Sequence, residues 1–163
     1  MVRNWRNDPK IYQFMEYREY ITPEMQVKWF NRINNNNNYY FIIEVNNEDI
    51  GLINVKDIDY NQREGEVGIF IYNDKYLNSL VTFAAILCLS DFCFEKLNLK
   101  TLIAHTLQTN PSASRFIKGI GFELLDNQEN IENQEYRLYE ENYLRQKSKV
   151  SNVLNSVYTQ KTT

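Results

Sequence analysis

The chain contains a single histidine, His105, and imidazole is the side chain best able to exchange a proton near neutral pH. It lies within Thr101 to Leu107, a run whose pattern predicts a β-strand, on the strand face shared with Ile103 and Leu107. Two interpretations stay open for His105. It is either a residue of a functional site or, as is commoner, a packed or partly exposed strand residue.

A second candidate for chemistry is the start of the most apolar segment, Asn78 to Leu97. Its apolar residues recur at three- and four-residue steps, which predicts a helix that Asn78 or Ser79 can cap. A strand pattern over Glu64 to Tyr72 precedes this helix and the Thr101 strand follows it, which predicts a βαβ unit. The helix start then lies beside the end of the first strand, where unpaired N–H groups and the helix dipole favour an anionic ligand.

Composition limits the class of protein. The 163 residues carry 18 Lys and Arg against 21 Asp and Glu, a net charge of −3, and they are enough for one domain with a buried core. This balance gives no basic field for nucleic acid, and no cluster of Lys and Arg indicates a membrane surface. The apolar helix is interrupted at Ser90 and Asp91, so it is too short to span a bilayer.

The cysteines and glycines exclude further classes of protein. Cys88 and Cys93 lie on one predicted helix but face different directions, which favours small core residues of a reduced, cytoplasmic protein. The polar start of the chain predicts no signal peptide. One histidine without a Cys/His cluster argues against a metal site, and the five glycines form no dinucleotide-binding or phosphate-loop pattern.

The other segments complete an α/β pattern in one domain, residues 1–145, followed by a polar tail, residues 146–163, that is expected to be disordered. A short helix after Asp8-Pro9 is predicted within residues 3–19, with Pro9 in its first turn. Further helices are predicted over 23–33 and 112–118, and strands over 39–45, 49–58, 122–125 and 135–140. The second helix is capped by Thr22, and its apolar stripe consists of Val27, Phe30 and Ile33. The asparagine run 34–38 is interpreted as an exposed loop, and the first three strands as an antiparallel meander.

The order of these elements, together with N-P-S-A-S-R-F-I-K-G-I-G-F at 110–122, resembles the GNAT family of N-acetyltransferases. The opening W-R-N-D-P-K-I-Y-Q-F-M at 5–15 is similar to a narrower branch of that family. This branch holds ribosomal-protein N-terminal acetyltransferases and the amino-sugar-nucleotide N-acetyltransferase of pseudaminic acid synthesis. D-I-G-L-I-N-V at 49–55 and E-V-G-I-F-I at 66–71 also fit. The resemblance implies a GNAT-like α/β fold, with a mostly antiparallel sheet around the βαβ core.

Two departures from the family pattern stand out. The family usually has a strand before its first helix, whereas this chain begins almost at Trp5, so an edge strand is missing or Met1 to Asn4 is its remnant. Members also carry (Gln/Arg)-x-x-Gly-x-(Gly/Ala) at the start of the central helix, where this chain has Leu77 to Thr82. Leu80 and Thr82 replace the two glycines and are expected to crowd a diphosphate, although the polar side chains of the stretch offer hydrogen bonds.

The resemblance implies direct transfer of an acetyl group from acetyl-CoA to an amine in a ternary complex. The amine must lose a proton, the thioester oxygen must be stabilised as charge grows, and the thiolate must be protonated. By the same resemblance the coenzyme lies along the splayed end of the Glu64–Tyr72 strand and at the helix start. The residues implied are Phe70, Ile71, Tyr72, Leu77, Asn78, Ser79, Leu80, Val81, Thr82 and Asn110.

The resemblance also implies the catalytic groups. Glu66 is the candidate base, directly or through water, and for this it needs a raised pKa or a bound water; otherwise it is a solvated carboxylate beside Arg63. Asn110 matches a family Asn that holds coenzyme backbone or a water, or it simply ends the strand in an Asn-Pro turn. The usual proton donors to the thiolate are absent, because Ile117 and Ala113 occupy their positions.

Arg6, Met15 and His105 are the candidates for the acceptor side, where relatives place the segment around Trp5 and Phe14. Arg6 either pairs with a phosphate of a nucleotide-sugar or forms a surface ion pair, and the apolar side chains of this segment are more often core.

The sequence therefore predicts an acetyl-CoA-dependent N-acetyltransferase without a metal. An amino-sugar nucleotide is the leading acceptor, followed by a protein N-terminus or a small amine. The alternative is a degenerate, non-catalytic member that binds a ligand or a protein. We expect a cytoplasmic protein that can form a homodimer and has no nucleic-acid or membrane partner.

Overall fold

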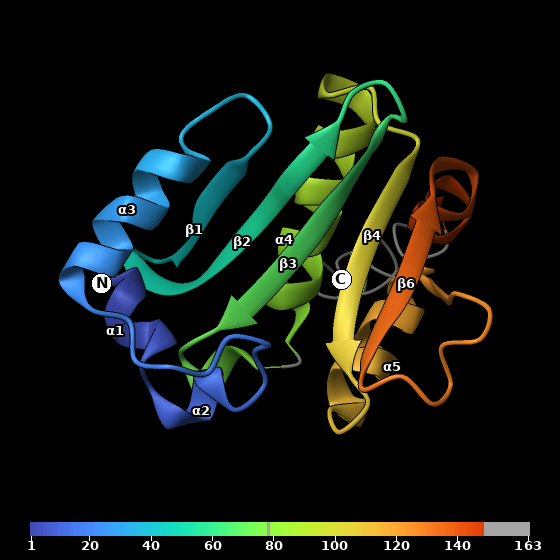
Figure 1. Ribbon diagram of the computed structural model, residues 1–163. Coiled ribbons are helices and arrows are strands. Elements are labelled where there is room, and N and C mark those ends of the chain that lie inside the picture. Colours follow the sequence, from blue (N-terminus) through green and yellow to red (C-terminus); the bar gives the residue numbers. More distant parts are fainter. Residues whose placement is uncertain (78, 149–163) are drawn as a thin grey trace, which may run out of the picture.

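The structure, a computed structural model, describes residues 1–77 and 79–148. Its centre is a six-stranded sheet in the order β1-β2-β3-β4-β6-β5 (Figure 1). The strands are β1 (Tyr39–Val45), β2 (Glu48–Asp59), β3 (Glu64–Ile71), β4 (Thr101–Leu107), β5 (Glu123–Leu124) and β6 (Asn133–Tyr139). β3 and β4 run parallel, and all other neighbours are antiparallel. The predicted GNAT-like α/β fold, with its mostly antiparallel sheet and central βαβ unit, is confirmed.

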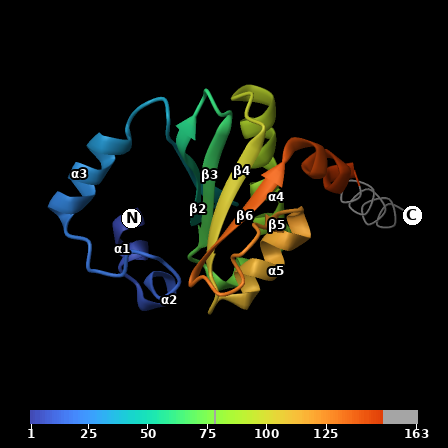
Figure 2. The same ribbon diagram turned by 45° about the vertical axis from the view of Figure 1, so that its right-hand side comes forward.

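Helices cover the two faces of the sheet unequally. They are α1 (Val2–Arg6), α2 (Pro9–Tyr12), α3 (Pro23–Ile33), α4 (Leu80–Asp91) and α5 (Pro111–Ile120), and residues 140–148 are also helical. Figure 2 shows the sheet between α4 and α5 on one side and the N-terminal helices α1 to α3 on the other. The face toward α4 and α5 is the core face.

Helix α4 is the core element that the sequence predicts over residues 78–97. Ser79 caps it by accepting a hydrogen bond from the Thr82 amide, and the helix continues into a π-helical turn over Phe92–Lys96. Its buried residues pack with the inward side chains of the strands and of α5. The cluster includes Val55, Val67, Ile86, Leu89, Cys93, Leu102, Ile117, Ile120, Tyr136 and Leu138. The alternating period of β3 marks its buried residues Val67 and Ile71 correctly. The three- and four-residue period of α4 predicts the helix but not its buried face. Leu80 and Ala84, which carry that period, are exposed, whereas Thr82, Ile86 and Leu89 are buried.

The connections follow local side-chain chemistry. Asn46 and Asn47 both have positive φ, 51° and 63°, which makes the β1–β2 connection a type I′ hairpin turn. The asparagine run 34–38 is a loop, as expected, and it is tied to the end of β2 because the Asn37 side chain donates to the Ile58 carbonyl at 2.6 Å. Gly121, with φ of 114°, ends α5 in the left-handed conformation.

The N-terminal segment holds the short helix predicted after Asp8-Pro9, which is α2, and a further short helix, α1, before it. The chain forms two short helices that break at Asn7 and Asp8, because both side chains bond to backbone. Asp8 caps α2 by accepting from the Lys10 amide, and the Asn7 amide group binds both the N–H and the C=O of Ile21. Met1 to Asn4 is not a strand remnant, since α1 begins at Val2. Among the described residues β1 is therefore the edge strand.

Helix α3 has the predicted bounds and the predicted Thr22 cap, but its apolar stripe is not buried. An apolar stripe normally faces the core. Here Val27 is 60% exposed and Phe30 54% exposed, and the helix instead packs through Trp29, whose ring meets Tyr40 edge-on at 5.1 Å. The outer side of the sheet therefore carries apolar side chains in contact with solvent.

The last described segment packs on α4. The Tyr143 hydroxyl donates to the Leu87 carbonyl at 3.0 Å and to Asp91 Oδ1 at 2.7 Å, and Lys147 Nζ lies 2.5 Å from the same oxygen. Residues 146–148 belong to this helix, and the rest of the tail expected to be disordered, 149–163, lies outside the described residues. Within the described ranges no helix combines the length and apolar character needed to cross a membrane.

Candidate active site

The candidate site is built on an early stop in the pairing of two strands. β3 and β4 pair only through Glu64–Glu66 and Thr101–Ile103, and beyond these residues the strands diverge (Figure 1). The remainder of β3 stays paired with β2, and the remainder of β4 with β6. Main-chain groups along the diverging edges are thereby left for a ligand, with their positions already fixed by the sheet. We call this opening the β3–β4 split.

The start of α4 follows the end of β3 and is open to an anion. Ser79 Oγ caps the Thr82 amide at 3.4 Å, and among the described residues no acceptor takes the amide hydrogens of Leu80 and Val81. The Thr82 hydroxyl donates to the Tyr76 carbonyl at 2.7 Å and is buried, so it does not crowd this end of the helix. Leu80 is 67% exposed at the helix start. Within the described part of the chain, these two amides and the helix dipole are therefore open to a phosphate.

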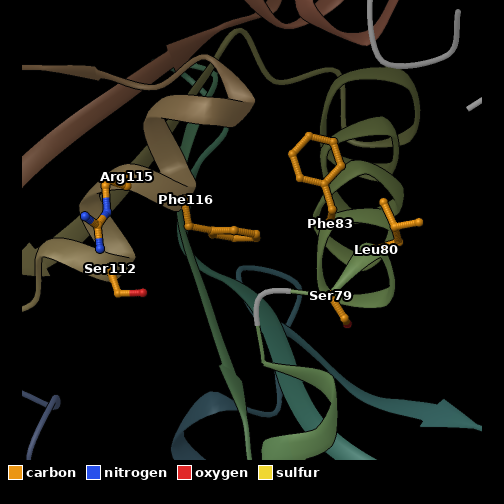
Figure 3. A pocket seen from close by; sticks show the side chains of 6 residues that line it. All are labelled: Ser79, Leu80, Phe83, Ser112, Arg115 and Phe116. Atoms are coloured by element: carbon orange, nitrogen blue, oxygen red, sulfur yellow. The ribbon is translucent and has the colours of Figure 1, made fainter. Parts of the chain in front are cut away.

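A cavity of about 450 Å³ opens between the starts of α4 and α5. Its walls are Ser79, Leu80 and Phe83 from α4 and Ser112, Arg115 and Phe116 from α5 (Figure 3). The Phe116 ring extends toward α4 and meets the Phe83 ring edge-on, with ring centroids 6.3 Å apart (Figure 3). Arg115 is exposed, and the arginine ion pairs of the described residues involve only Arg18 and Arg137. The guanidinium of Arg115 is thus available to an anion at this cavity.

The opposite, open face of the sheet carries charged residues at the narrow end of the split. Lys56 lies opposite Glu66 on neighbouring strands, and its Nζ is 2.9 Å from Glu66 Oε1. His105 Nδ1 is 3.7 Å from the same oxygen. The structure therefore brings together two residues, Glu66 and His105, that the sequence places on separate strands.

These neighbours set the direction of each pKa. Burial raises the pKa of Glu66, but the hydrogen bonds and charges of His105 and Lys56 together outweigh it and hold the pKa below its usual value. The pKa of His105 is raised, chiefly by Glu66 and against the effect of partial burial. A lowered pKa is opposite to what a direct carboxylate base requires. Among the described residues no three His, Cys, Asp or Glu side chains gather as a metal site.

The coenzyme candidates on β3 lie beside an aromatic cluster. Trp5 stacks on Tyr72 at 5.3 Å and meets Phe70 edge-on at 6.2 Å, while Ile71 is buried in the core. The Tyr72 amide donates to the Ile50 carbonyl at 2.7 Å, so this N–H is not free for a ligand. A coenzyme could therefore contact these residues only through other main-chain groups of β3 or through the ring of Phe70. Asn78 lies outside the described residues.

Arg6 and Met15, two of the residues expected on the acceptor side, are in contact with each other. Arg6 Nη1 is 3.3 Å from Met15 Sδ, and Nη2 is 3.4 Å from the Tyr17 carbonyl. Arg6 Nε is buried and has no acceptor among the described residues. Burial lowers the pKa of Arg6, an effect that the nearby Tyr40 opposes. The surface ion pair that was one interpretation of Arg6 is not formed within the described part of the chain.

Asn110 serves as the N-cap of α5. Its Oδ1 accepts from the Ala113 amide at 3.2 Å, and Pro111 follows at the first helical position. Of the two serines nearby, Ser112 lines the cavity, whereas Ser114 Oγ lies 3.1 Å from Thr106 Oγ1. Because Oδ1 of Asn110 caps the helix, only its side-chain NH₂ group could bind a ligand.

Sequence reasoning did not single out Phe83, Arg115 and Phe116. The signal was present in part, because Ser112, Arg115 and Phe116 follow the helical three- and four-residue spacing and share one face of α5. That face could not be assigned to a site until α5 was seen to lie against α4.

Comparison with protein families matches residues 1–123 to the family described as acetyltransferase (GNAT) domain. The match spans 123 of the 163 residues. The chain belongs to this GNAT family. The chain is therefore an acetyl-CoA-dependent N-acetyltransferase. This reaction needs a site for the acetyl donor and a site for the amine. No curated protein matches the sequence.

Solved structures support the same fold. Spermidine N-acetyltransferase from Vibrio cholerae in complex with CoA and spermine has a TM-score of 0.71 and 21% identity, covering 88% of this chain and 90% of that one. A chimera of that enzyme has a TM-score of 0.73 and 20% identity over the same shares. A domain from Methanocaldococcus jannaschii has a TM-score of 0.69 and 21% identity, covering 85% of this chain and 89% of that one. Identities this low establish the GNAT fold and nothing finer.

The cavity between α4 and α5 generates a prediction about coenzyme affinity. Replacing Arg115 with Ala removes the one cation in its wall, and we expect acetyl-CoA to bind about tenfold more weakly, or about 1.4 kcal/mol. The control is Lys118→Ala on the same helix, whose ammonium lies over the Tyr136 ring instead. Calorimetric titration measures both. Equal losses in the two variants would show that Arg115 makes no specific phosphate contact.

Proposed function

We propose that the chain acetylates the primary amine of an amino-sugar nucleotide at the narrow end of the β3–β4 split. The observation that carries this proposal is the meeting of two features at one place. The open main chain of β3 offers a site for an extended donor, and Glu66, His105 and Lys56 stand at the end of that site on the open face. An amine approaching from this face meets groups that can orient it and move its proton.

The residues of the split fit acetyl-CoA. The amides of Leu80 and Val81 and the guanidinium of Arg115 are suited to its phosphates, and the free edge of β3 to its amide-containing arm. When bound, the coenzyme supplies an acetyl thioester. Fixed main-chain N–H groups of β3 would hold the thioester oxygen as negative charge grows on it. These assignments are consistent with direct transfer in a ternary complex.

Arg6 supports an acceptor that carries negative charge. Its guanidinium is partly buried, lacks a carboxylate partner among the described residues, and leaves Nε without an acceptor. A buried cation without a partner is unfavourable, so a ligand phosphate at Arg6 would remove that cost. Spermidine, the substrate named for the Vibrio cholerae neighbours, carries only positive charges and would not compensate Arg6. The charge of Arg6 therefore favours the amino-sugar nucleotide and the branch of the family that acts on it.

The acceptor prediction is tested by measuring thiol release from acetyl-CoA with a panel of amines. We expect a higher kcat/KM for a nucleotide-linked amino sugar than for the free amino sugar or spermidine. Replacing Arg6 with Met should lower kcat/KM for the nucleotide-linked acceptor by at least about tenfold, because one charge-assisted phosphate contact is lost.

The matched control is Arg18→Met, whose guanidinium is exposed and 3.9 Å from Glu132. This variant should leave kcat/KM unchanged for all three acceptors. Preference for spermidine over the nucleotide-linked amine would contradict the acceptor assignment while leaving acetyl transfer intact.

We also propose that the protein forms a homodimer through the outer edge of the sheet. The apolar side chains Val27, Phe30, Phe41 and Ile42 are exposed on α3 and β1, which lie side by side at this edge (Figure 1). β1 contains no Pro or Lys, the residues that commonly protect an edge strand. Two copies related by a twofold axis can pair their β1 strands antiparallel, and Ile42 of one copy then lies near Ile42 of the other. A second copy would pair the free main-chain groups of β1 and bury the apolar side chains beside them.

Light scattering coupled to gel filtration tests this arrangement. The wild-type mass should be that of a dimer, and Ile42→Lys should give a monomer because it puts two like charges together at the twofold axis. Ile131→Lys is the control, since Ile131 is 45% exposed and Ile42 39%, but Ile131 lies in the loop before β6. A monomeric wild-type protein, or a dimeric Ile42→Lys variant, would refute the β1 interface.

We place the protein in the cytoplasm. Its two cysteines are free thiols, with Cys93 buried in the core, where burial raises the pKa of the thiol to about 12. Such an unreactive, unpaired thiol suits a reducing compartment.

A further inference from the structure

His105 stands at the end of a row of charged residues that crosses the open face of the sheet. Lys56 on β2, Glu66 on β3 and His105 on β4 meet at a single atom, Glu66 Oε1, with distances of 2.9 Å to Lys56 Nζ and 3.7 Å to His105 Nδ1. Glu66 and Ile103 are the last residues through which β3 and β4 pair. His105 is two residues beyond Ile103 on the same face of β4, so it lies where the split begins.

The geometry fixes which imidazole nitrogen is available. Nδ1 is the nitrogen that faces the carboxylate, so it carries the proton in the neutral ring, and Nε2 is left as the proton acceptor. The His105 side chain is 30% exposed, which allows an acceptor to reach Nε2 from the open face. Glu66 is the weaker base of the two, because its ion pair with Lys56 at 2.9 Å stabilises the charged carboxylate.

We propose that His105, oriented by Glu66, takes the proton from the acceptor amine, an inference that rests on the proposed acetyl transfer. Nε2 accepts one proton from the ammonium group, which leaves a neutral amine and an imidazolium stabilised by Glu66. The amine lone pair then forms the N–C bond to the acetyl carbon as the C–S bond breaks. The second amine proton goes with the leaving thiolate, and the imidazolium releases its proton to water. His105 is the catalytic base, and Glu66 is a positioning residue.

The charges around the ring determine how this step depends on pH. Glu66 raises the pKa of His105 most strongly; Glu135, opposite it on β6, also raises it, while burial and Lys56 lower it. Glu135 is itself engaged by Arg137, whose Nε is 2.8 Å away, and Arg137 also faces Glu64 at 3.5 Å. Because the pKa is raised, the neutral ring predominates only above a pH higher than the usual histidine value. Activity should therefore rise with pH through that value.

The single histidine of the chain permits a direct test by NMR of the imidazole nitrogens in untagged protein. In the wild type we expect the neutral ring to carry its proton on Nδ1 and to titrate above pH 6.5, the ordinary histidine pKa. Glu66→Gln should move that titration to lower pH. Glu135→Gln is the control and should move it less, because Arg137 already neutralises Glu135. A proton on Nε2, or a titration unchanged in Glu66→Gln, would overturn the inference.

The pH profile of kcat/KM supplies the second test. The acid limb of the wild type should coincide with the NMR titration, and Glu66→Gln should shift both together. His105→Gln should lose at least about 100-fold in kcat, the usual contribution of a general base, without weaker binding of acetyl-CoA.

The failures are distinguishable. A wild-type protein that binds acetyl-CoA but acetylates no amine would overturn the proposed function and, with it, this role of His105. Acetylation that persists in His105→Gln with an unchanged pH profile would overturn the role of His105 alone.

Discussion

The parallel pairing of β3 and β4 stops after three residues on each strand, and the geometry of the candidate active site depends on this stop. Each strand is otherwise bound along its length to an antiparallel neighbour, β3 to β2 and β4 to β6. The sheet therefore consists of two antiparallel halves that share a short seam. Helix α4 connects the halves along the chain and packs beneath them, so they can diverge without exposing the core face. The split leaves main-chain groups open without disrupting either half.

The same seam concentrates charge. Residues of alternating sign lie on adjacent strands of the open face, from Lys56 through Glu66 and His105 to Glu135. Each of the three with a shifted pKa, Lys56, Glu66 and His105, is shifted in the direction that keeps its charge, although burial alone would act the other way. Arg6 differs because no carboxylate of the described residues compensates it. In the proposed mechanism, proton transfer and anion recognition therefore fall to different residues.

Much of this architecture could be predicted from the sequence, because its signals are local. The period of the apolar residues located α4, β3 and β4, and side-chain caps located the helix starts at Ser79 and Thr22. Within residues 3–19 the helix start at Pro9 was predicted, but the separate helix α1 was not, because its end depends on bonds from Asn7 and Asp8 to backbone. The stripe of α3 was misplaced for a different reason. Whether an apolar face is buried depends on what packs against it, and α3 uses Trp29 instead.

The site was predictable in its parts but not in its assembly. Glu66, His105 and Arg6 were named from residue type and from resemblance, whereas the approach of Glu66 to His105 depends on the register of β3 and β4. Arg115 was missed because its role depends on α5 lying against α4 (Figure 3). The expected crowding by Thr82 does not arise, since its hydroxyl bonds to the Tyr76 carbonyl, a contact that sequence alone cannot reveal.

The most direct test of the central claim is amide hydrogen exchange of the protein with and without acetyl-CoA. If the β3–β4 split is the donor site, acetyl-CoA should slow exchange in the part of β3 beyond Glu66 and at the start of α4. Exchange in β1, on the far side of β2, should not change. Binding of acetyl-CoA that leaves β3 and α4 unprotected, or no binding at millimolar coenzyme, would contradict the account.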